Sequence, residues 1–219
     1  MRIRFQQSLE DLRSQLLGMA ALAESGVEHA LKAYSTRDLT ECALVFRSEP
    51  EINRLEREID RMAIDLLATE QPMAIDLRFI LSIIRINGDL ERVGDQAVNI
   101  AARVQDTGST SSPELPVNIP LLGSLAMKMV RQAVQAFADG DAAKAKHVLE
   151  LDDEVDAMNT RTFTTLNTLI LESPAITSQA LNDLIIARNL ERVGDHATNI
   201  AEDVIFWVQG ADVRHNAKN

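Results

Sequence analysis

The chain has 219 residues, of which 46% are hydrophobic, 25% charged and only 4% aromatic. This is the composition of a folded protein, and the abundance of Ala, Leu, Ile, Glu and Arg favours helices over strands. The formal net charge of -11 argues against a nucleic-acid-binding surface, which needs clustered Lys and Arg.

Cys42 is the only cysteine, which excludes an internal disulfide and a Cys-rich metal site. The N-terminal residues turn polar at once, and no apolar run approaches the roughly 20 residues that span a bilayer. We therefore expect a cytoplasmic protein that reaches a membrane only through its partners.

Six long segments with helical periodicity follow one another along the chain. Short turns separate most of them, so consecutive helices should pack antiparallel. Asp38 is a candidate N-cap, and Pro50 should kink the second helix or mark a break near Ser48. The expected helices cover residues 2–35, 38–69, 73–106, 120–139, 141–171 and 176–209.

One longer interruption divides these segments into three plus three. Residues 107–116 are small, polar and proline-containing, which is typical of a linker. We predict an all-α fold of two tandem three-helix bundles, at 1–106 and 119–219, joined by a linker at 107–118.

The two halves carry a repeated segment. Residues 90–101, LERVGDQAVNIA, and 190–201, LERVGDHATNIA, agree at ten of twelve positions in the third helix of each half. A weaker match relates residues 49–55 to 152–158 in the second helix. An internal duplication explains both matches.

A helical wheel separates each repeated segment into an apolar and a polar side. In the last helix the apolar stripe consists of Ile186, Leu190, Val193, Ala197, Ile200 and Val204. Opposite to it lie oxygen-bearing side chains at i, i+4 spacing. We call Glu91, Asp95 and Asn99 the first column, and Glu191, Asp195 and Asn199 the second column.

Neighbouring carboxylates repel each other, so each column favours a positive charge. Carboxylate and amide oxygens suit a hard or borderline cation, and an acidic pair on the neighbouring helix would complete the shell. The candidate pairs are Glu49 with Asn53 and Asp152 with Asp156. The alternative is a solvated charged face, in which Arg92, Arg192 and Arg188 pair with the acids.

Three further residues lie close to the columns. Gly94 and Gly194 each cost about 1 kcal/mol in a helix interior relative to Ala, which indicates close approach of another helix. His196 is either an additional ligand or, more commonly for a single helical histidine, a surface or interhelical residue. Phe206 and Trp207 are expected to be buried between the bundles rather than to face a partner.

Familiar catalytic signatures are missing, among them a phosphate-binding loop, a G-x-S-x-G elbow, H-E-x-x-H and E-x-x-H. The sequence therefore predicts no catalytic residues and no enzyme. Two other functions stay open: a metal-free helical interaction module, and a hydrolase in which metal ions activate water.

The paired L-E-R-V-G-D-x-A-x-N-I-A segments in two three-helix repeats resemble the PhoU family of phosphate-transport regulators. The resemblance covers nearly the whole chain and includes Asp76-Leu77-Arg78 after Gln71-Pro72. It implies a cytoplasmic, non-enzymatic regulator that lowers phosphate uptake and represses the phosphate-starvation response.

The resemblance also implies partners and a cofactor. The partners are the ATPase subunit of the phosphate ABC transporter and a sensor histidine kinase, and the chain would form a homodimer. The cofactor is a metal centre, mainly iron or zinc and with manganese or nickel as alternatives, which is multinuclear in several members. The implied ligands are Glu49, Asn53, Glu91, Asp95 and Asn99 in one site, and Asp152, Asp156, Glu191, Asp195 and Asn199 in the other. Pro50 and Asn53 make the first site weaker or differently shaped, and Glu56 with Asp60 could replace its acidic pair.

Overall fold

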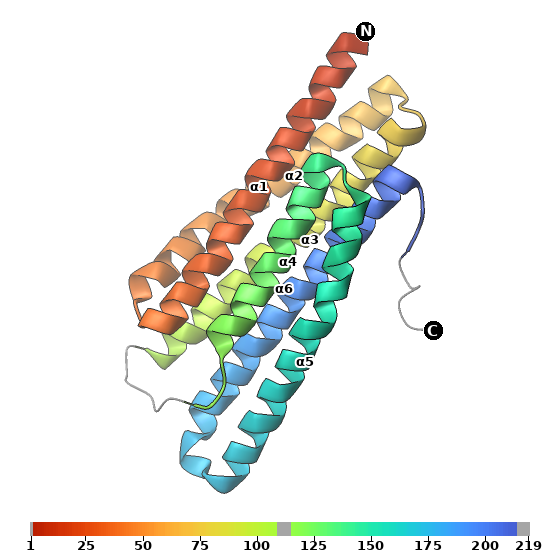
Figure 1. Cartoon of the computed structure of the whole chain (residues 1–219). Helices are drawn as coiled ribbons and strands as arrows, with labels where there is room; N and C mark the ends of the chain where they lie inside the picture. The colour runs from red at the N-terminus through yellow and green to blue at the C-terminus, as the bar shows by residue number, and fades with distance from the viewer. Residues whose placement is uncertain (1, 109–114, 214–219) are drawn as a thin grey trace.

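The computed structural model describes residues 2–108 and 115–213. Every regular element within these residues is a helix, as predicted. Figure 1 shows the helices lying side by side in one elongated body. Six are α-helices, and a short 3-10 turn, η1 (Pro174–Ile176), precedes the last of them. The α-helices are α1 (Arg2–Thr36), α2 (Leu39–Glu70), α3 (Ala74–Thr107), α4 (Ile119–Asp139), α5 (Ala142–Glu172) and α6 (Thr177–Gln209).

Local capping sets most of these boundaries. The Asp38 side chain accepts a hydrogen bond from the backbone N–H of Thr40 at 2.9 Å, which confirms the predicted N-cap of α2. Asp141 caps α5 in the same way through the N–H groups of Ala143 and Lys144. Gly140 has a left-handed backbone (φ 63°) at the end of α4, a conformation that glycine adopts without steric cost.

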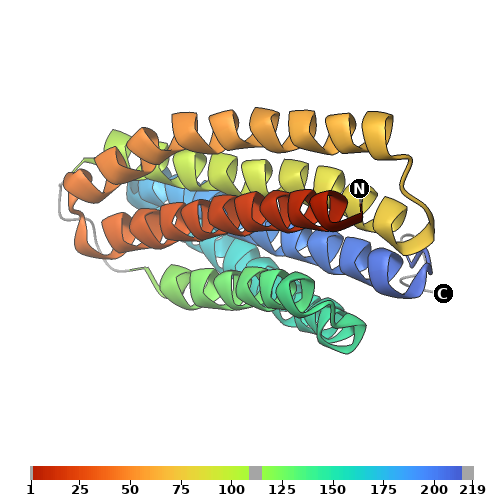
Figure 2. The same cartoon turned by 90° about the horizontal axis from the view of Figure 1, so that it is seen from above.

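Of the two outcomes expected at Pro50, a break near Ser48 is excluded, because α2 continues through this residue. Figure 2 shows that the first third of α2 runs at an angle to the rest of the helix. Pro50 is exposed, whereas Val45, Ile52 and Leu55 on the same helix are buried. Burial of these apolar side chains offsets the one backbone hydrogen bond that a proline removes.

The six α-helices form two three-helix bundles, α1–α3 and α4–α6, as predicted. Within each bundle every helix contacts the other two, and α3 with α6 and α1 with α4 join the bundles. Residues 109–114 of the predicted linker lie outside the described residues. No helix in the described part of the chain is both long and apolar enough to cross a membrane.

Helices α3 and α6 run antiparallel along the contact between the bundles. Arg78 Nε donates to the Trp207 carbonyl at 3.1 Å, and Arg85 Nη1 lies 3.0 Å from Asp203 Oδ1. Further along, Asp89 contacts His196. The same register places Val93 opposite Val193, so the two repeated segments face each other at the middle of the contact.

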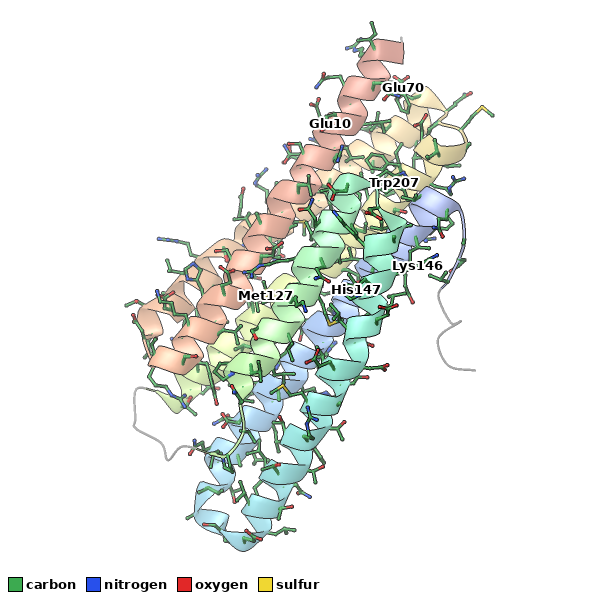
Figure 3. The ribbon with its side chains drawn as sticks, in the orientation of Figure 1. Glu10, Glu70, Met127, Lys146, His147 and Trp207 are labelled. Atoms are coloured by element: carbon green, nitrogen blue, oxygen red, sulfur yellow. The ribbon has the colours of Figure 1, made fainter. Side chains whose placement is uncertain are left out.

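An aromatic cluster closes one end of this contact. The rings of Phe79 and Phe137 stack with centroids 5.9 Å apart, and Trp207 lies 4.8 Å from Phe79 and 5.6 Å from Phe137. These side chains come from α3, α4 and α6, and Figure 3 shows Trp207 beside the end of α4. Trp207 lies between the bundles, as predicted, but Phe206 and Trp207 are both only half-buried, so their predicted burial is confirmed only in part.

The two repeated glycines allow close helix packing, as predicted. A Cβ atom on Gly94 would lie 2.9 Å from Ile52 Cδ1, whereas one on Gly194 would meet Val155 Cγ1 at 3.4 Å, an ordinary contact. The first repeat is therefore the tighter of the two at this position.

This difference predicts opposite outcomes for alanine at the two positions. Gly194→Ala should raise the free energy of unfolding by up to about 1 kcal/mol, because alanine favours a helix interior. Gly94→Ala should lose that gain, since buried Ile52 must move to admit the methyl group. Urea unfolding of both variants checks this. Equal stabilisation by both would contradict the packing difference.

Candidate functional site

The two columns lie on the side of α3 and α6 that faces away from the core. Burial follows the same order over residues 90–101 and 190–201. The apolar positions are buried except for half-buried Val98, Glu91 and Glu191 are half-buried, and the Asp and Asn of each column are exposed. All six residues of the apolar stripe of α6 are buried. The helical wheel of the sequence is thus confirmed in both repeats.

The second column faces the predicted acidic pair on α5. Partial burial, followed by the negative charges of Asp195 and Asp156, raises the pKa of Glu191 above its usual value. Partial burial and then Asp156 raise the pKa of Asp195 as well, and Asp152 acts on Glu191. Four carboxylates from two helices therefore share one surface.

The first column faces a different set of acids on α2. Partial burial and then Glu49 raise the pKa of Asp95, while burial, Asp95 and then Glu56 raise the pKa of Glu91. Asn53 Nδ2 donates to Glu49 Oε1 at 3.0 Å, so these two predicted ligands bind each other.

Glu56 and Asp60, the alternative acidic pair for the first site, have different environments. Glu56 lies near Glu91, as this alternative requires. Asp60 accepts a hydrogen bond from Asn87 Nδ2 at 3.0 Å instead. The acidic surroundings of the first column thus come from Glu49 and Glu56 rather than from a regular i, i+4 pair.

Arginines near the columns act at a distance. Arg92 lowers the pKa values of Glu91 and Asp95 by its charge, and Arg188 does so for Glu191, but each of these effects is smaller than that of burial. No ion pair within 4 Å joins an arginine to an acid of either column in residues 2–108 and 115–213. The alternative in which arginines form ion pairs with the acids of the columns is therefore not supported.

His196 is an interhelical residue, the more common of the two expectations for it. Its Nδ1 lies 2.9 Å from Asp89 Oδ1 on α3, and its ring is buried. Asn199 Nδ2 donates to the same Asp89 oxygen at 3.0 Å. Asp89, which the sequence analysis did not single out, thereby ties the second column to the first repeat. The only signal for it was its position two residues before Glu91.

The side chains of the two columns carry the donor atoms that a metal ion needs, but these atoms do not converge on one point. Their carboxylate and amide oxygens are ligands that hard and borderline cations accept. Across the described ranges, however, no three His, Cys, Asp or Glu side chains are arranged around a common point as a metal requires. Each predicted site would need its carboxylates to rotate inward.

The raised pKa values predict a pH-dependent cost to stability. A carboxyl whose folded pKa is raised binds more protons when folded, so its contribution falls as pH rises from the usual values, 4.5 for Glu and 3.8 for Asp, through the folded pKa. In metal-free protein, Glu191→Gln with Asp195→Asn should therefore stabilise the fold at pH 7 by a few tenths of a kcal/mol. Near pH 4 the difference should shrink. Urea unfolding at both pH values checks this, and a gain that grows in acid would contradict it.

Comparison with known proteins identifies the family. The family model described as the PhoU domain matches residues 16–104 and 119–204, one match to each bundle. A phosphate-specific transport system accessory protein PhoU homolog of Pseudomonas aeruginosa is 42% identical over 213 residues, covering 97% of this chain and 88% of that protein. A Clostridium acetobutylicum protein of the same name is 30% identical and covers 97% of both chains.

Solved structures agree in fold over nearly the full length. The crystal structure of PhoU from Pseudomonas aeruginosa superposes with a TM-score of 0.91 at 41% identity and covers 94% of this chain and 100% of that one. The phosphate transport system regulatory protein PhoU from Streptococcus pneumoniae gives a TM-score of 0.84 at 26% identity, covering 95% and 99%. With a duplicated helical fold, duplicated motifs and these matches, the chain belongs to the PhoU family.

Proposed function

We propose that this protein is a non-enzymatic accessory regulator of a phosphate-specific transport system. The observation that carries the proposal is that relatives with this name, 30% to 42% identical, align with 97% of the chain. The protein would act in the cytoplasm as a homodimer. It would lower phosphate uptake and repress the phosphate-starvation response through contacts with the transporter's ATPase subunit and a sensor histidine kinase.

Gene deletion tests the regulatory role. Loss of the protein should raise phosphate uptake at high external phosphate and switch on starvation genes, and re-expression of the intact chain should reverse both effects. Purified ATPase subunit and kinase should each bind the protein in pull-downs. Unchanged uptake after deletion, together with empty pull-downs, would refute the role.

We propose further that the two columns bind metal ions, with iron or zinc first and manganese or nickel as alternatives. The first site would use Glu49, Asn53, Glu91, Asp95 and Asn99, and the second Asp152, Asp156, Glu191, Asp195 and Asn199. Support comes from the oxygen donors and from the mutual repulsion that raises the pKa values of Glu91, Asp95, Glu191 and Asp195. A bound cation would neutralise this repulsion and join α2 to α3 and α5 to α6.

Removing two ligands should release metal without unfolding the protein. Glu191→Ala with Asp195→Ala should lower the metal content of protein purified without an affinity tag, as measured by elemental analysis. Helix content by circular dichroism should not change, because both side chains lie off the core stripe. Asp153→Ala with Glu154→Ala removes the same charge from exposed positions of α5 and should retain metal.

Either of two results would overturn the metal proposal. If the intact protein contained no iron, zinc, manganese or nickel, and its melting temperature did not respond to these ions, the chain would be a metal-free interaction module. If both double variants retained the same metal content as the intact protein, metal would bind elsewhere.

A further inference from the structure

A polar cavity lies at the end of the molecule opposite to the aromatic cluster. It is found where the carboxyl end of α1 meets the amino ends of α4 and α6, at the lower end of the molecule in Figure 1. Its volume is about 600 Å³, which is enough for a small organic molecule. The polar part of its wall consists of Tyr34, Arg37, Asn118, Gln179 and Asp183.

The internal duplication relates the polar cavity to the aromatic cluster. In the registers that align Glu49 with Asp152 and Leu90 with Leu190, four residues of the cavity wall have equivalents in the other repeat. Tyr34 corresponds to Phe137, Gln179 to Phe79, Asp183 to Ile83 and Arg37 to Gly140. Arg37 and Gly140 both have a left-handed backbone, with φ 56° and 63°, which supports this alignment.

The two equivalent corners differ in how they are filled. Phe137 and Ile83 are buried apolar side chains, and a Cβ atom on Gly140 would lie 3.3 Å from Trp207 Cη2. The corner at the aromatic cluster is therefore packed, whereas all four equivalent residues at the cavity are polar. A buried carboxylate and an arginine with a left-handed backbone both reduce stability. Because the fold forms an apolar corner from the same elements, it does not require this polar one.

Asp183 and Arg37 bring opposite charges to the cavity without pairing. Asp183 is 3% exposed, and its Oδ1 accepts a hydrogen bond from the Tyr34 hydroxyl at 3.1 Å. The Arg37 guanidinium lies over the face of the same ring, 5.1 Å from its centroid. Within residues 2–108 and 115–213 neither residue forms an ion pair. Tyr34 thus holds the two charges apart on the wall of one cavity.

The carboxylate of Asp183 retains acceptor capacity for a ligand. Burial raises its pKa, and the Tyr34 hydrogen bond and then the charge of Arg37 lower it by less. An ionised carboxylate can accept about four hydrogen bonds, and the Tyr34 hydroxyl supplies one of them. A ligand that donates to the others would compensate for the burial of this charge.

We propose that the polar cavity binds a small dipolar molecule with an ammonium group at one end and a phosphate or carboxylate at the other. The ammonium group would donate hydrogen bonds to Asp183, and the anionic group would accept them from the Arg37 guanidinium. The carbon atoms between them would contact Val117 and Pro120, which also line the cavity. This site goes beyond the proposed function and does not depend on it.

Two simpler occupants fit the cavity less well. An inorganic phosphate ion would contact Arg37, but it would lie beside the buried carboxylate of Asp183, which repels it. A metal ion needs several oxygen donors, whereas the cavity offers one carboxylate and an arginine that repels cations. A molecule with both charges satisfies both residues.

Two unique aromatic residues make binding measurable in the intact chain. Tyr34 is the only tyrosine and Trp207 the only tryptophan, so isotope labelling of these residue types gives one set of ring signals from the cavity and one from the packed corner. Phosphoethanolamine and γ-aminobutyrate are the probes. Each should shift the Tyr34 signals with a Kd below about 1 mM and leave the Trp207 indole signal in place.

Molecules that carry only one of the two groups test the dipolar requirement. Ethanolamine and inorganic phosphate should each bind at least about tenfold more weakly than phosphoethanolamine. Equal affinities for all three would show that the cavity does not need both groups and would overturn the proposal. So would the absence of any Tyr34 shift at about 10 mM of both dipolar probes.

Two substitutions test the two ends of the cavity separately. Asp183→Asn keeps an acceptor for Tyr34 but removes the charge, and Arg37→Gly installs the residue of the other repeat, which the left-handed backbone favours. Each should weaken binding of both dipolar probes about tenfold. Asp183→Asn should in addition tighten binding of inorganic phosphate, because the repelling charge is gone.

A matched control removes the same charges elsewhere. Asp153→Asn with Arg57→Ala changes exposed residues of α5 and α2 and should leave both affinities unchanged. An unaltered Trp207 signal shows that each variant is folded, and Arg37→Gly still tests the site if Asp183→Asn does not fold. Unchanged affinities in Asp183→Asn and Arg37→Gly would place the probes elsewhere and refute the site.

Vesicles distinguish a free molecule from a lipid head group. Phosphatidylethanolamine carries the same two groups at a bilayer surface, and the protein should remain in the supernatant when such vesicles are sedimented. Co-sedimentation that Arg37→Gly abolishes would contradict the choice of a free molecule and assign the cavity to a lipid head group.

Discussion

Replacing Phe137 by Ala should lower the free energy of unfolding by about 3–5 kcal/mol, within the range of large-to-small changes in a packed core. Phe137 is only 1% exposed and packs between Phe79 of the first bundle and Trp207 of α6. Its removal leaves a cavity where three helices meet. Unfolding by urea at 25 °C measures the loss.

Phe163→Ala is the matched control for this prediction. It makes the same chemical change on a helix of the same repeat, but Phe163 is largely exposed. Its effect should stay within about 0.5 kcal/mol of zero, as for most surface substitutions. Similar losses in both variants would mean that the aromatic cluster does not hold the bundles together.

Asp89→Ala should cost about 2–3 kcal/mol, because it leaves the buried Nδ1 of His196 without its partner and removes a second hydrogen bond from Asn199. One oxygen of Asp89 contacts both His196 Nδ1 and Asn199 Nδ2. The side chains of Asp89 and His196 are only 12% and 8% exposed, so water cannot fully replace these contacts. A thermal or urea unfolding curve gives the magnitude.

The duplicated chain provides the control for this change too. Asn189 occupies the position of Asp89 in the second repeat, and its Nδ2 donates to the Ile185 carbonyl of its own helix at 2.7 Å. Among the described residues no hydrogen bond from the Asn189 side chain to the other bundle is found, so Asn189→Ala should cost no more than about 1 kcal/mol. If both variants lost equal stability, the Asp89 contacts would contribute nothing beyond a local hydrogen bond.

Helix positions were predictable because local residues determine them. Asp38 and Asp141 cap helices through their own side chains, and Gly140 ends one through its left-handed backbone. Pro50 left open whether α2 bends or breaks, because a proline acts locally, whereas the buried residues on either side of it keep α2 continuous through tertiary packing.

The contact between the bundles was less predictable. Apolar periodicity shows that α3 and α6 each bury a stripe, but not which helix covers it. The pairing is visible only in long-range contacts such as Arg85 with Asp203 and Asp89 with His196. Residues one turn away in α6 are close to His196, yet its partner Asp89 is 107 residues away in the sequence.

The candidate site was predictable in part. Spacing placed both columns on the outer face and named Asp156 as the neighbour of Asp195, which the electrostatics of the fold reproduce. Spacing named Glu56 only together with Asp60, as an alternative pair. It did not show that Glu56 lies near Glu91 while Asp60 does not, because that depends on the rotation of α2 against α3. Whether metal binds either column stays a prediction.

The antiparallel contact of α3 and α6 has a consequence for how this chain is organised. Identical sequences that cross antiparallel and face each other at their midpoints are related by a local twofold axis, the arrangement of an isologous dimer. The chain is in effect a homodimer of a three-helix unit whose subunits have been joined covalently. Once joined, the two copies could change independently. Asp89 pairs with His196 on one side of the axis, and Asn189 and Gln96 occupy the corresponding positions on the other side. A dimer of identical chains cannot have this difference.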